Sequence, residues 1–324
     1  MKEKRKLVHL SVAVVLGACL LLSARAARKA LWHYQASQPR KDADAALQVG
    51  DSKRLYDLHV SSAYTGEKPT PLVLAFHGAA GDGQAMEQVT GLNQIADQEG
   101  FIVAYPDALP PRKHWDARRG SGPDTSNDVG FIAALIDELS QRYTVDRSRI
   151  YIVGLSNGGM FAQRLACELS DRVTAIAAVA SAMPTNLSTT CNPTKPISVL
   201  LINGTQDDLI PPVEPGKALL SLPDTVKFWK AHNRCSAEAV RKSLPQNPHL
   251  ELETYDQCAN QTRVMLSTIE GGTHGWGDDP ISGGDNLVKP GQEMNESAFI
   301  WSFLSQQSSE VQTSSQPQQS TTNN

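Results

Sequence analysis

The sequence predicts an α/β fold in which a mostly parallel central sheet carries helices on both faces. Short apolar runs typical of buried strands alternate along the chain with segments of helical periodicity. The chain has 324 residues and 40% hydrophobic content. That is enough for a full core, and folds of this class commonly form one domain of about 200–250 residues. We therefore expect one main domain, at residues 50–304, with short appendages.

The N-terminal segment, residues 1–26, has the layout of an export signal. A basic start, M-K-E-K-R-K, precedes an almost uncharged apolar run at residues 7–24, and A-R-A at residues 24–26 offers a cleavage site. We expect a secreted or periplasmic protein. Two alternatives stay open: the apolar run could remain as a membrane anchor, or Cys19 could carry a lipid.

The charge distribution argues against nucleic acid as a partner. The whole chain carries −4 and residues 1–26 carry +4, so the remainder carries about −8. Such a body has no electrostatic reason to bind nucleic acid or an anionic membrane surface. A membrane contact is expected only through the N-terminal segment, if it is not cleaved. The sequence indicates no oligomeric state.

Besides Cys19, the chain contains four cysteines: Cys167, Cys191, Cys235 and Cys258. An even number in an exported chain predicts disulfides, with three possible connectivities. Pairing Cys167 with Cys191 and Cys235 with Cys258 is preferred, because it closes two local loops of similar length; buried free thiols are the alternative. No C-x-x-C spacing and no cluster of cysteine with histidine is present, so no zinc site is expected.

The elements are predicted in order from composition and spacing. Residues 27–49 are polar and alanine-rich, which indicates a linker, and residues 305–324 are almost all Ser, Gln, Thr and Asn, which predicts a disordered tail. Strands are expected at residues 54–60, 72–76, 101–105, 150–153, 174–180, 197–203 and 264–269, and helices at residues 127–143, 160–169, 225–231 and 293–304.

The turn between the strand at 150–153 and the helix at 160–169 contains G-L-S-N-G, residues 154–158. This matches G-x-S-x-G, the nucleophile elbow of α/β-hydrolases, in the strand–turn–helix context that the motif requires. Glycines two positions from the serine leave room for a strained turn that exposes Ser156. The Asn157 amide then starts a helix, where an unpaired N–H can receive an oxyanion. The alternative is an ordinary glycine-rich turn.

A second oxyanion donor is expected in the small-residue loop H-G-A-A-G-D-G after the strand at 72–76. We assign it to the Ala79 amide. His77 is expected to order this loop, because it precedes the serine in the chain. Trp115 lies in the long connection at residues 108–125, which could shape a binding cleft. It either stacks on a substrate or anchors the loop.

The base and the acid follow from the order Ser, Asp or Glu, His of α/β-hydrolases. His232 lies on a predicted helix and His249 in a polar, proline-flanked stretch. His274 follows a strand and stands among glycines, as a general base above a nucleophile requires. Asp207 and Asp208 both end a core strand, where catalytic groups of open sheets lie. The pattern alone does not separate these two carboxylates.

Five segments of the chain resemble the exported esterases of the polyhydroxybutyrate depolymerase family. They read P-L-V-L-A-F-H-G-A-A-G, D-V-G-F-I-A-A-L-I-D, Y-I-V-G-L-S-N-G-G-M-F-A-Q-R-L-A-C-E, L-I-N-G-T-Q-D-D-L-I-P-P and G-G-T-H-G-W-G. They occur in order over roughly residues 50–304. The family is similar to the feruloyl and acetyl-xylan esterases of carbohydrate esterase family 1.

The resemblance implies a role for several residues. It implies Ser156 as nucleophile, His274 as base and, through G-T-x-D-x-x-x-P ending at Pro211, Asp207 as acid. It also supports the Cys167–Cys191 pair, because the cysteine belongs to the family's L-A-C-E.

The chain departs from the family pattern at two positions. Ala79 stands where the family often has cysteine, which leaves the backbone donor but removes any disulfide there. Gly277 replaces proline after Trp276, so an aromatic wall at Trp276, the second tentative substrate contact, is expected to be looser.

The expected function is that of an exported serine esterase that works through an acyl-enzyme and needs no metal or organic cofactor. The ester substrate is expected to be a polyhydroxyalkanoate oligomer, a feruloylated or acetylated polysaccharide, or a small ester. Two alternatives remain: a non-catalytic envelope binding protein that keeps the hydrolase fold, and a serine peptidase.

Overall fold

The computed structural model describes residues 43–118, 126–210, 218–236, 238–244, 247–277 and 295–309. The predicted export signal with Cys19, the position of Pro211 and residues 310–324 of the predicted tail lie outside the described residues. None of the helices in the described ranges is long and apolar enough to cross a membrane.

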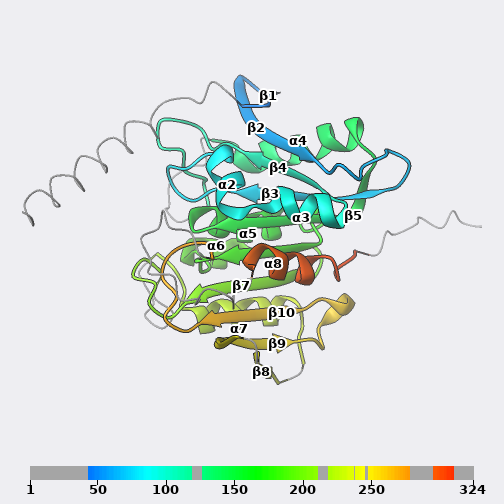
Figure 1. Cartoon of the computed structure of the whole chain (residues 1–324). Helices are drawn as coiled ribbons and strands as arrows, with labels where there is room; N and C mark the ends of the chain where they lie inside the picture. Colours follow the sequence, from blue (N-terminus) through cyan, green and yellow to red (C-terminus); the bar gives the residue numbers. More distant parts are fainter. Residues whose placement is uncertain are drawn as a thin grey trace, which may run out of the picture.

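Strands and helices alternate through the middle of the chain (Figure 1). The strands are β1 (Ala45–Val49), β2 (Ser52–Val60), β3 (Thr70–Phe76), β4 (Ile102–Pro106), β5 (Val145–Leu155), β6 (Ala175–Val179), β7 (Ser198–Gly204), β8 (Val240–Leu244), β9 (Asn247–Tyr255) and β10 (Val264–Ile269). The helices are α2 (Gly83–Thr90), α3 (Leu92–Glu99), α4 (Asp128–Arg142), α5 (Asn157–Glu168), α6 (Thr185–Thr190), α7 (Leu222–His232) and α8 (Glu296–Leu304), with the short 3-10 helix η1 (Ala259–Gln261).

The described strands form one sheet in the order β1-β2-β4-β3-β5-β6-β7-β10-β9-β8. From β4 to β10 along this order every neighbouring pair is parallel, and the outer pairs are antiparallel. The predicted mostly parallel sheet is confirmed. Because parallel strands end at a common edge, the loops after β3, β5, β7 and β10 meet there.

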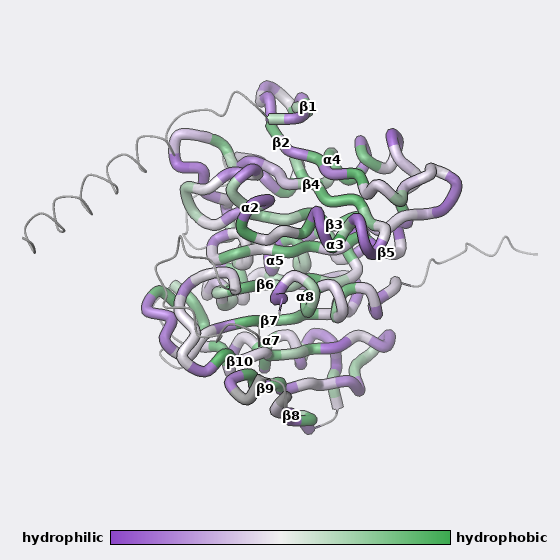
Figure 2. The backbone as a smooth tube through the Cα atoms, viewed as in Figure 1, coloured by the Kyte–Doolittle hydropathy of each residue, from purple (hydrophilic) through white to green (hydrophobic). Residues whose placement is uncertain are grey.

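The two faces of the sheet pack against different helices. Leu72, Leu74 and Phe76 of β3 face the core shared with α4, α5, α6 and α7, whereas Val73 and Ala75 face the core shared with α2, α3 and α8. Figure 1 shows α2, α3 and the red α8 in front of the sheet, and Figure 2 shows hydrophobic residues along the central strands. Strands buried on both faces explain the continuous apolar runs of the sequence.

The folded domain extends beyond both predicted boundaries, residues 50 and 304. Residues 27–49 were predicted as a linker, but Ala45–Val49 form β1, which pairs with β2 and alternates between half-buried and exposed residues. Residues 305–309, expected in the disordered tail, pack on the sheet: the Gln307 carbonyl accepts a hydrogen bond from the Tyr151 hydroxyl at 2.6 Å, and the Gln307 amide oxygen accepts one from Ser198 Oγ at 2.8 Å. Residues 305–309 are polar, but the hydrogen bonds of Gln307 attach them to the sheet.

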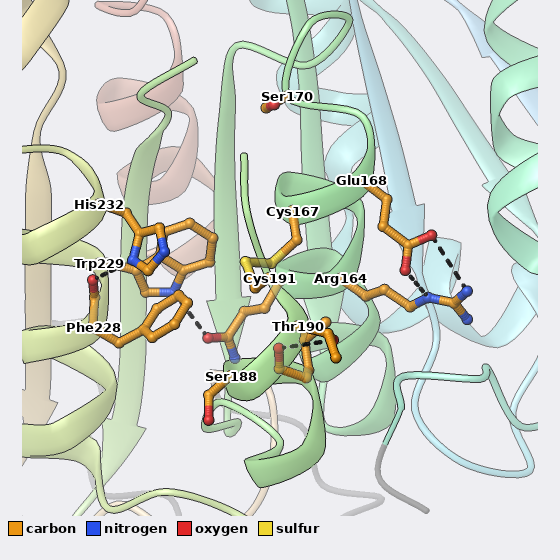
Figure 3. The surroundings of a disulfide bond; sticks show 12 residues. Arg164, Cys167, Glu168, Ser170, Ser188, Thr190, Cys191, Phe228, Trp229 and His232 are labelled. Atoms are coloured by element: carbon orange, nitrogen blue, oxygen red, sulfur yellow. Dashed lines mark hydrogen bonds and ion pairs between the residues drawn. A yellow bond between two sulfur atoms is a disulfide. The ribbon is translucent and has the colours of Figure 1, made fainter. Parts of the chain in front are cut away.

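Both preferred disulfides are present. Cys167 of α5 is bonded to Cys191, which follows α6 (Figure 3). Cys235, just after α7, is bonded to Cys258, between β9 and η1. The first bond joins α5, the helix that follows the predicted nucleophile, to the end of α6.

Candidate active site

The predicted elbow is a sharp turn between β5 and α5. Ser156 has φ +54° and ψ −115°, a backbone conformation that costs free energy for any residue but glycine. A Cβ on Gly154 would lie 2.2 Å from the Gly158 carbonyl oxygen, and one on Gly158 would lie 2.3 Å from the Phe76 carbonyl oxygen. Both glycines are therefore required by close main-chain packing around the serine.

Ser156, His274 and Asp207 form one chain of hydrogen bonds. His274 Nε2 lies 2.8 Å from Ser156 Oγ, and His274 Nδ1 lies 2.9 Å from Asp207 Oδ2. A carboxylate can only accept, so Nδ1 carries the proton and Nε2 is free to accept the serine proton. This is the geometry that a general base needs beside a nucleophile.

The structure separates the two neighbouring carboxylates that the sequence pattern left equivalent. Asp207 is buried and contacts His274, whereas Asp208 is exposed. The backbone N–H groups of Leu209 and Ile210 donate to Asp207 Oδ1 at 2.9 and 2.8 Å. The carboxylate that meets the histidine is thus fixed by the turn in which it lies.

The rejected histidines have other partners. His232 Nδ1 donates within α7 to the Phe228 carbonyl at 2.9 Å, and His249 lies at the surface 3.5 Å from Glu270. Neither lies in the loop after β10 that carries His274.

The loops of Asp207 and His274 touch through their main chains. A Cβ on Gly204 would lie 2.1 Å from the Gly272 carbonyl oxygen, which leaves no space for another residue. The same Gly272 carbonyl accepts a hydrogen bond from the Gln206 N–H at 2.8 Å, and Thr205 Oγ1 accepts one from the Gly271 N–H at 2.8 Å. These contacts set the distance between the loops after β7 and β10.

The loop after β3 lies against Ser156. An added Cβ on Gly78 would come to 3.5 Å from the Ser156 Cβ. The Ala80 N–H donates to the Lys113 carbonyl and the Gly81 N–H to the Gly78 carbonyl, so neither is available to a ligand. Ala79, between Gly78 and Ala80, is exposed, and Asn157 is the first residue of α5, where an N–H has no partner within the helix. The geometry is compatible with the two predicted oxyanion donors.

His77 orders this loop, as expected. Its Nε2 accepts a hydrogen bond from the Ala108 N–H at 3.1 Å, so Nδ1 carries the proton and donates to the Gly78 carbonyl at 2.7 Å. Burial lowers the pKa of His77 to about 4. The imidazole therefore joins the loops after β3 and β4 as a neutral group.

The two tryptophans named as tentative substrate contacts are both buried. For Trp115 this favours the alternative that it anchors the loop, and for Trp276 it contradicts a substrate contact. Trp115 is 0% exposed; its ring stacks on Phe161 and meets Phe76 edge to face, so it anchors the loop. Trp276 is 3% exposed, lies in the core beside α8, and donates from Nε1 to Ser297 Oγ at 3.2 Å. Neither ring has a free face for a ligand.

Charged side chains that were not predicted from the sequence hold the loop around Trp115. Arg164 of α5 is 2% exposed and donates to the Asp116 carbonyl at 2.6 Å, while Asp128 accepts from the Asp116 N–H at 2.9 Å. Lys113 forms a 3.0 Å ion pair with Asp82. The available signal was a single arginine in the largely apolar run M-F-A-Q-R-L-A-C of residues 160–167, because such a cation is buried only with partners.

Within the described ranges, no three His, Cys, Asp or Glu side chains gather as they would around a metal ion. The reactive groups in this region are instead a serine, an imidazole and a carboxylate. Together, the mostly parallel sheet, the serine turn at its centre and this hydrogen-bonded chain define an α/β-hydrolase.

Comparison with known proteins identifies the family. Residues 55–187 match the family described as Esterase PHB depolymerase. The chain is 34% identical to "Putative esterase NocK" of Nocardia uniformis subsp. tsuyamanensis over 70% of its own length and 72% of that protein. It belongs to the polyhydroxybutyrate depolymerase family of esterases and is a carboxylic ester hydrolase.

Other similarities are more distant or cover less of the relative. The chain is 30% identical to "Feruloyl esterase B" of Piromyces equi over 67% of its own length, but it spans only 42% of that protein. The structure of the acetyl xylan esterase from Aspergillus awamori matches 81% of this chain and 99% of its own, with a TM-score of 0.57 and 14% identity. That likeness shows the shared fold.

Proposed function

We propose that the protein hydrolyses carboxylic esters through a covalent acyl-enzyme formed on Ser156, with His274 as general base and acid and Asp207 as its orienting carboxylate. The observation that carries this proposal is the unbroken chain of hydrogen bonds from Ser156 Oγ through the imidazole to a buried carboxylate. The tautomer that this chain imposes is the one that can accept the serine proton.

In the acylation step, Oγ of Ser156 attacks the ester carbonyl carbon while His274 Nε2 takes the hydroxyl proton. The carbonyl π electrons move to oxygen, and the backbone N–H groups of Ala79 and Asn157 stabilise the resulting oxyanion. Collapse of the tetrahedral intermediate breaks the ester C–O bond. His274 returns its proton to the leaving alcohol oxygen, and the acyl group stays on Ser156.

In the deacylation step, water enters where the alcohol left. His274 Nε2 takes a proton from this water, whose oxygen attacks the acyl carbon, and the same two amides hold the oxyanion. Breaking the bond to Oγ releases the carboxylic acid and returns the proton to Ser156.

The proposed substrates are polyhydroxyalkanoate oligomers or feruloyl and acetyl esters of polysaccharides. Support comes from family membership and from the names of relatives, which include feruloyl esterases and acetylxylan esterases. We also propose that the protein is secreted or periplasmic, because a chain with two disulfides fits an oxidising compartment.

The test is hydrolysis of p-nitrophenyl butyrate, methyl ferulate and soluble hydroxybutyrate oligomers by the full chain and by its Ser156→Ala variant. We expect the substitution to lower kcat by about 10⁶-fold, because the nucleophile is lost. The relative rates on methyl ferulate and on the hydroxybutyrate oligomers then distinguish a feruloyl esterase from an enzyme that acts on polyhydroxyalkanoates. Equal rates for both folded proteins would overturn the serine mechanism.

A further inference from the structure

Trp115 contacts both sides of the proposed oxyanion hole. Its indole N–H donates to the His77 carbonyl at 3.1 Å, two residues before Ala79. Its main chain meets the side chain of Asn157: the Trp115 N–H donates to Asn157 Oδ1 at 2.8 Å, and Asn157 Nδ2 donates to the Trp115 carbonyl at 3.1 Å. One residue thus connects the segments that carry the two donor amides.

The pair of hydrogen bonds between Asn157 and Trp115 defines how the side-chain amide is oriented. An N–H must face an oxygen and a C=O must face a donor, so only one of the two flip states satisfies both contacts. Asn157 is 3% exposed, so losing either bond would leave a buried polar group without a partner. The side chain of Asn157 therefore uses its oxygen and its NH2 group to bind Trp115, while the backbone N–H of Asn157 stays available to the oxyanion.

Aromatic packing keeps the indole in place. The Trp115 and Phe161 rings are stacked, with an interplanar angle of 6° and centroids 5.1 Å apart. Phe76, at the end of β3, meets Trp115 edge to face at 5.2 Å and Phe161 edge to face at 5.3 Å. Because Phe161 lies on α5 just after the elbow, the stack joins β3 to α5 next to the two proposed donors. Close packing of this kind leaves little freedom for either element to shift.

The loop of Ala79 is also held by Lys113, which belongs to the same connection after β4 as Trp115. The Ala80 N–H donates to the Lys113 carbonyl at 2.9 Å, and Lys113 Nζ lies 3.0 Å from Asp82 Oδ2. Asp82 also caps α2 by accepting from the Ala85 N–H at 3.0 Å. The segments of Ala79 and Asn157 also meet through the main chain, where a Cβ on Gly158 would lie 2.6 Å from the His77 carbonyl oxygen. The contacts of Trp115 with His77 and Asn157 are the side-chain connections that span the same two segments.

We infer that Trp115 and the side chain of Asn157 are positioning residues that set the spacing of the two oxyanion donors. The inference rests on the proposed function, since it assigns these contacts to the same acyl transfer. An oxyanion forms only in the tetrahedral intermediate, so a donor displaced by a fraction of an ångström weakens binding of that species much more than binding of the ester. The expected signature is a loss of kcat with little change in KM.

The experiment compares Trp115→Phe and Asn157→Asp with Trp229→Phe. Trp115→Phe removes the donor to His77, and Asn157→Asp replaces the donor to the Trp115 carbonyl by an acceptor. Trp229 is a matched control, because it is also 0% exposed and donates from Nε1 at 3.1 Å, but to Gln163 within the helical layer. Each folded protein is measured for kcat and KM on p-nitrophenyl butyrate and for midpoint of thermal unfolding.

A pair of inhibitors separates positioning from general damage. Ser156 Oγ adds to the carbonyl carbon of an alkyl trifluoromethyl ketone, and the resulting hemiketal places an oxyanion in the oxyanion hole. The matching methyl ketone binds largely as the neutral carbonyl compound. For both site variants we expect kcat and trifluoromethyl ketone affinity to fall together by about 10- to 100-fold. KM and methyl ketone affinity should stay within about threefold. Trp229→Phe should lower the unfolding midpoint while keeping kcat.

Two outcomes would overturn the inference. One is a folded Asn157→Asp protein with native kcat; the other is an equal loss of affinity for both ketones, which would indicate a loosened structure. Asn157→Asp carries the test alone if Trp115→Phe does not fold, because it keeps the size of the side chain. Failure of the proposed function looks different: there Ser156→Ala itself retains activity.

Discussion

The two halves of the candidate site are held together by different kinds of contact. Around Ser156, the main chains also meet closely, at Gly154 and Gly158, but side chains add further connections: an aromatic stack, a side-chain amide and a buried imidazole join three loops. Between the loops of Asp207 and His274, the main chains touch directly at Gly204 and Gly272. The first half can therefore be changed by removing a functional group as well as by adding atoms at Gly154 or Gly158, whereas the second is sensitive mainly to added atoms.

This difference follows from where each half lies in the sheet. The nucleophile turn lies between β3, β5 and α5, where side chains fill both faces and the first eleven residues of α5 are buried. The acid and base loops leave neighbouring parallel strands, β7 and β10, so their main chains run side by side from the start. Glycine is the residue that permits such a close approach.

After loss of the nucleophile itself, the largest effect should come from the acid. Asp207→Asn replaces Oδ2, which accepts the Nδ1 proton of His274, by an NH2 donor. The imidazole then no longer keeps its proton on Nδ1, so Nε2 is not free to accept the serine proton, and we expect kcat to fall by about 10⁴-fold. Asp208→Asn is the matched control, because Asp208 is exposed on the neighbouring position. Steady-state kinetics on p-nitrophenyl butyrate measure both. A comparable loss in the two variants would contradict the assignment of Asp207.

An effect of about 3 kcal/mol is expected from His77 as the pH falls. Its pKa is about 4 in the folded protein, below the ordinary value of 6.5, because burial disfavours the charged imidazole. Above pH 6.5 the imidazole is neutral in both states and contributes no pH dependence. Between pH 6.5 and 4 the unfolded chain binds a proton that the folded protein does not, so the free energy of unfolding falls by up to about 3 kcal/mol.

Urea unfolding at pH 7.5 and at pH 4.5 measures this effect. In His77→Gln the protein should be less stable at pH 7.5, since the hydrogen bonds to Ala108 and Gly78 change, but the decrease on acidification should be smaller than in the native chain. His59→Gln, at the partly exposed β2, serves as a control for loss of a histidine. An identical pH dependence in the native chain and in His77→Gln would exclude a buried neutral imidazole.

The sequence could predict whatever depends on local pattern. The elbow was predictable because its strand, glycines and helix are adjacent in the chain, and the central strands because burial on both faces makes them continuously apolar. The edge strand β8 was not, since residues 240–244 read V-R-K-S-L and an edge strand buries little apolar surface; β9, which pairs with it, was missed as well. β1 escaped prediction for the same reason.

The role of Trp115 could not be read from the sequence. A single aromatic in a long connection has no periodicity, so stacking on a substrate and anchoring the loop were equally compatible with its position. Its contacts with His77 and Asn157 span 38 and 42 positions of the chain. The choice of Asp207 over Asp208 likewise depended on the resemblance to a family, because only the turn of the loop decides which carboxylate faces inward.

The smallest effect tests the main-chain contact of the acid and base loops. In Gly204→Ala the added Cβ would lie 2.1 Å from the Gly272 carbonyl oxygen, so one loop must shift, and we expect the free energy of unfolding to fall by about 1–3 kcal/mol. Gly78→Ala is the matched substitution in the nucleophile half, where the new methyl group would meet only ordinary contacts, the nearest at 3.5 Å. Its stability should change by less than about 0.5 kcal/mol. Urea unfolding of both variants compares the two halves directly. Equal destabilisation would mean that the loop after β3 is held as tightly by its main chain as the acid and base loops are, and the contrast between these loops would not hold.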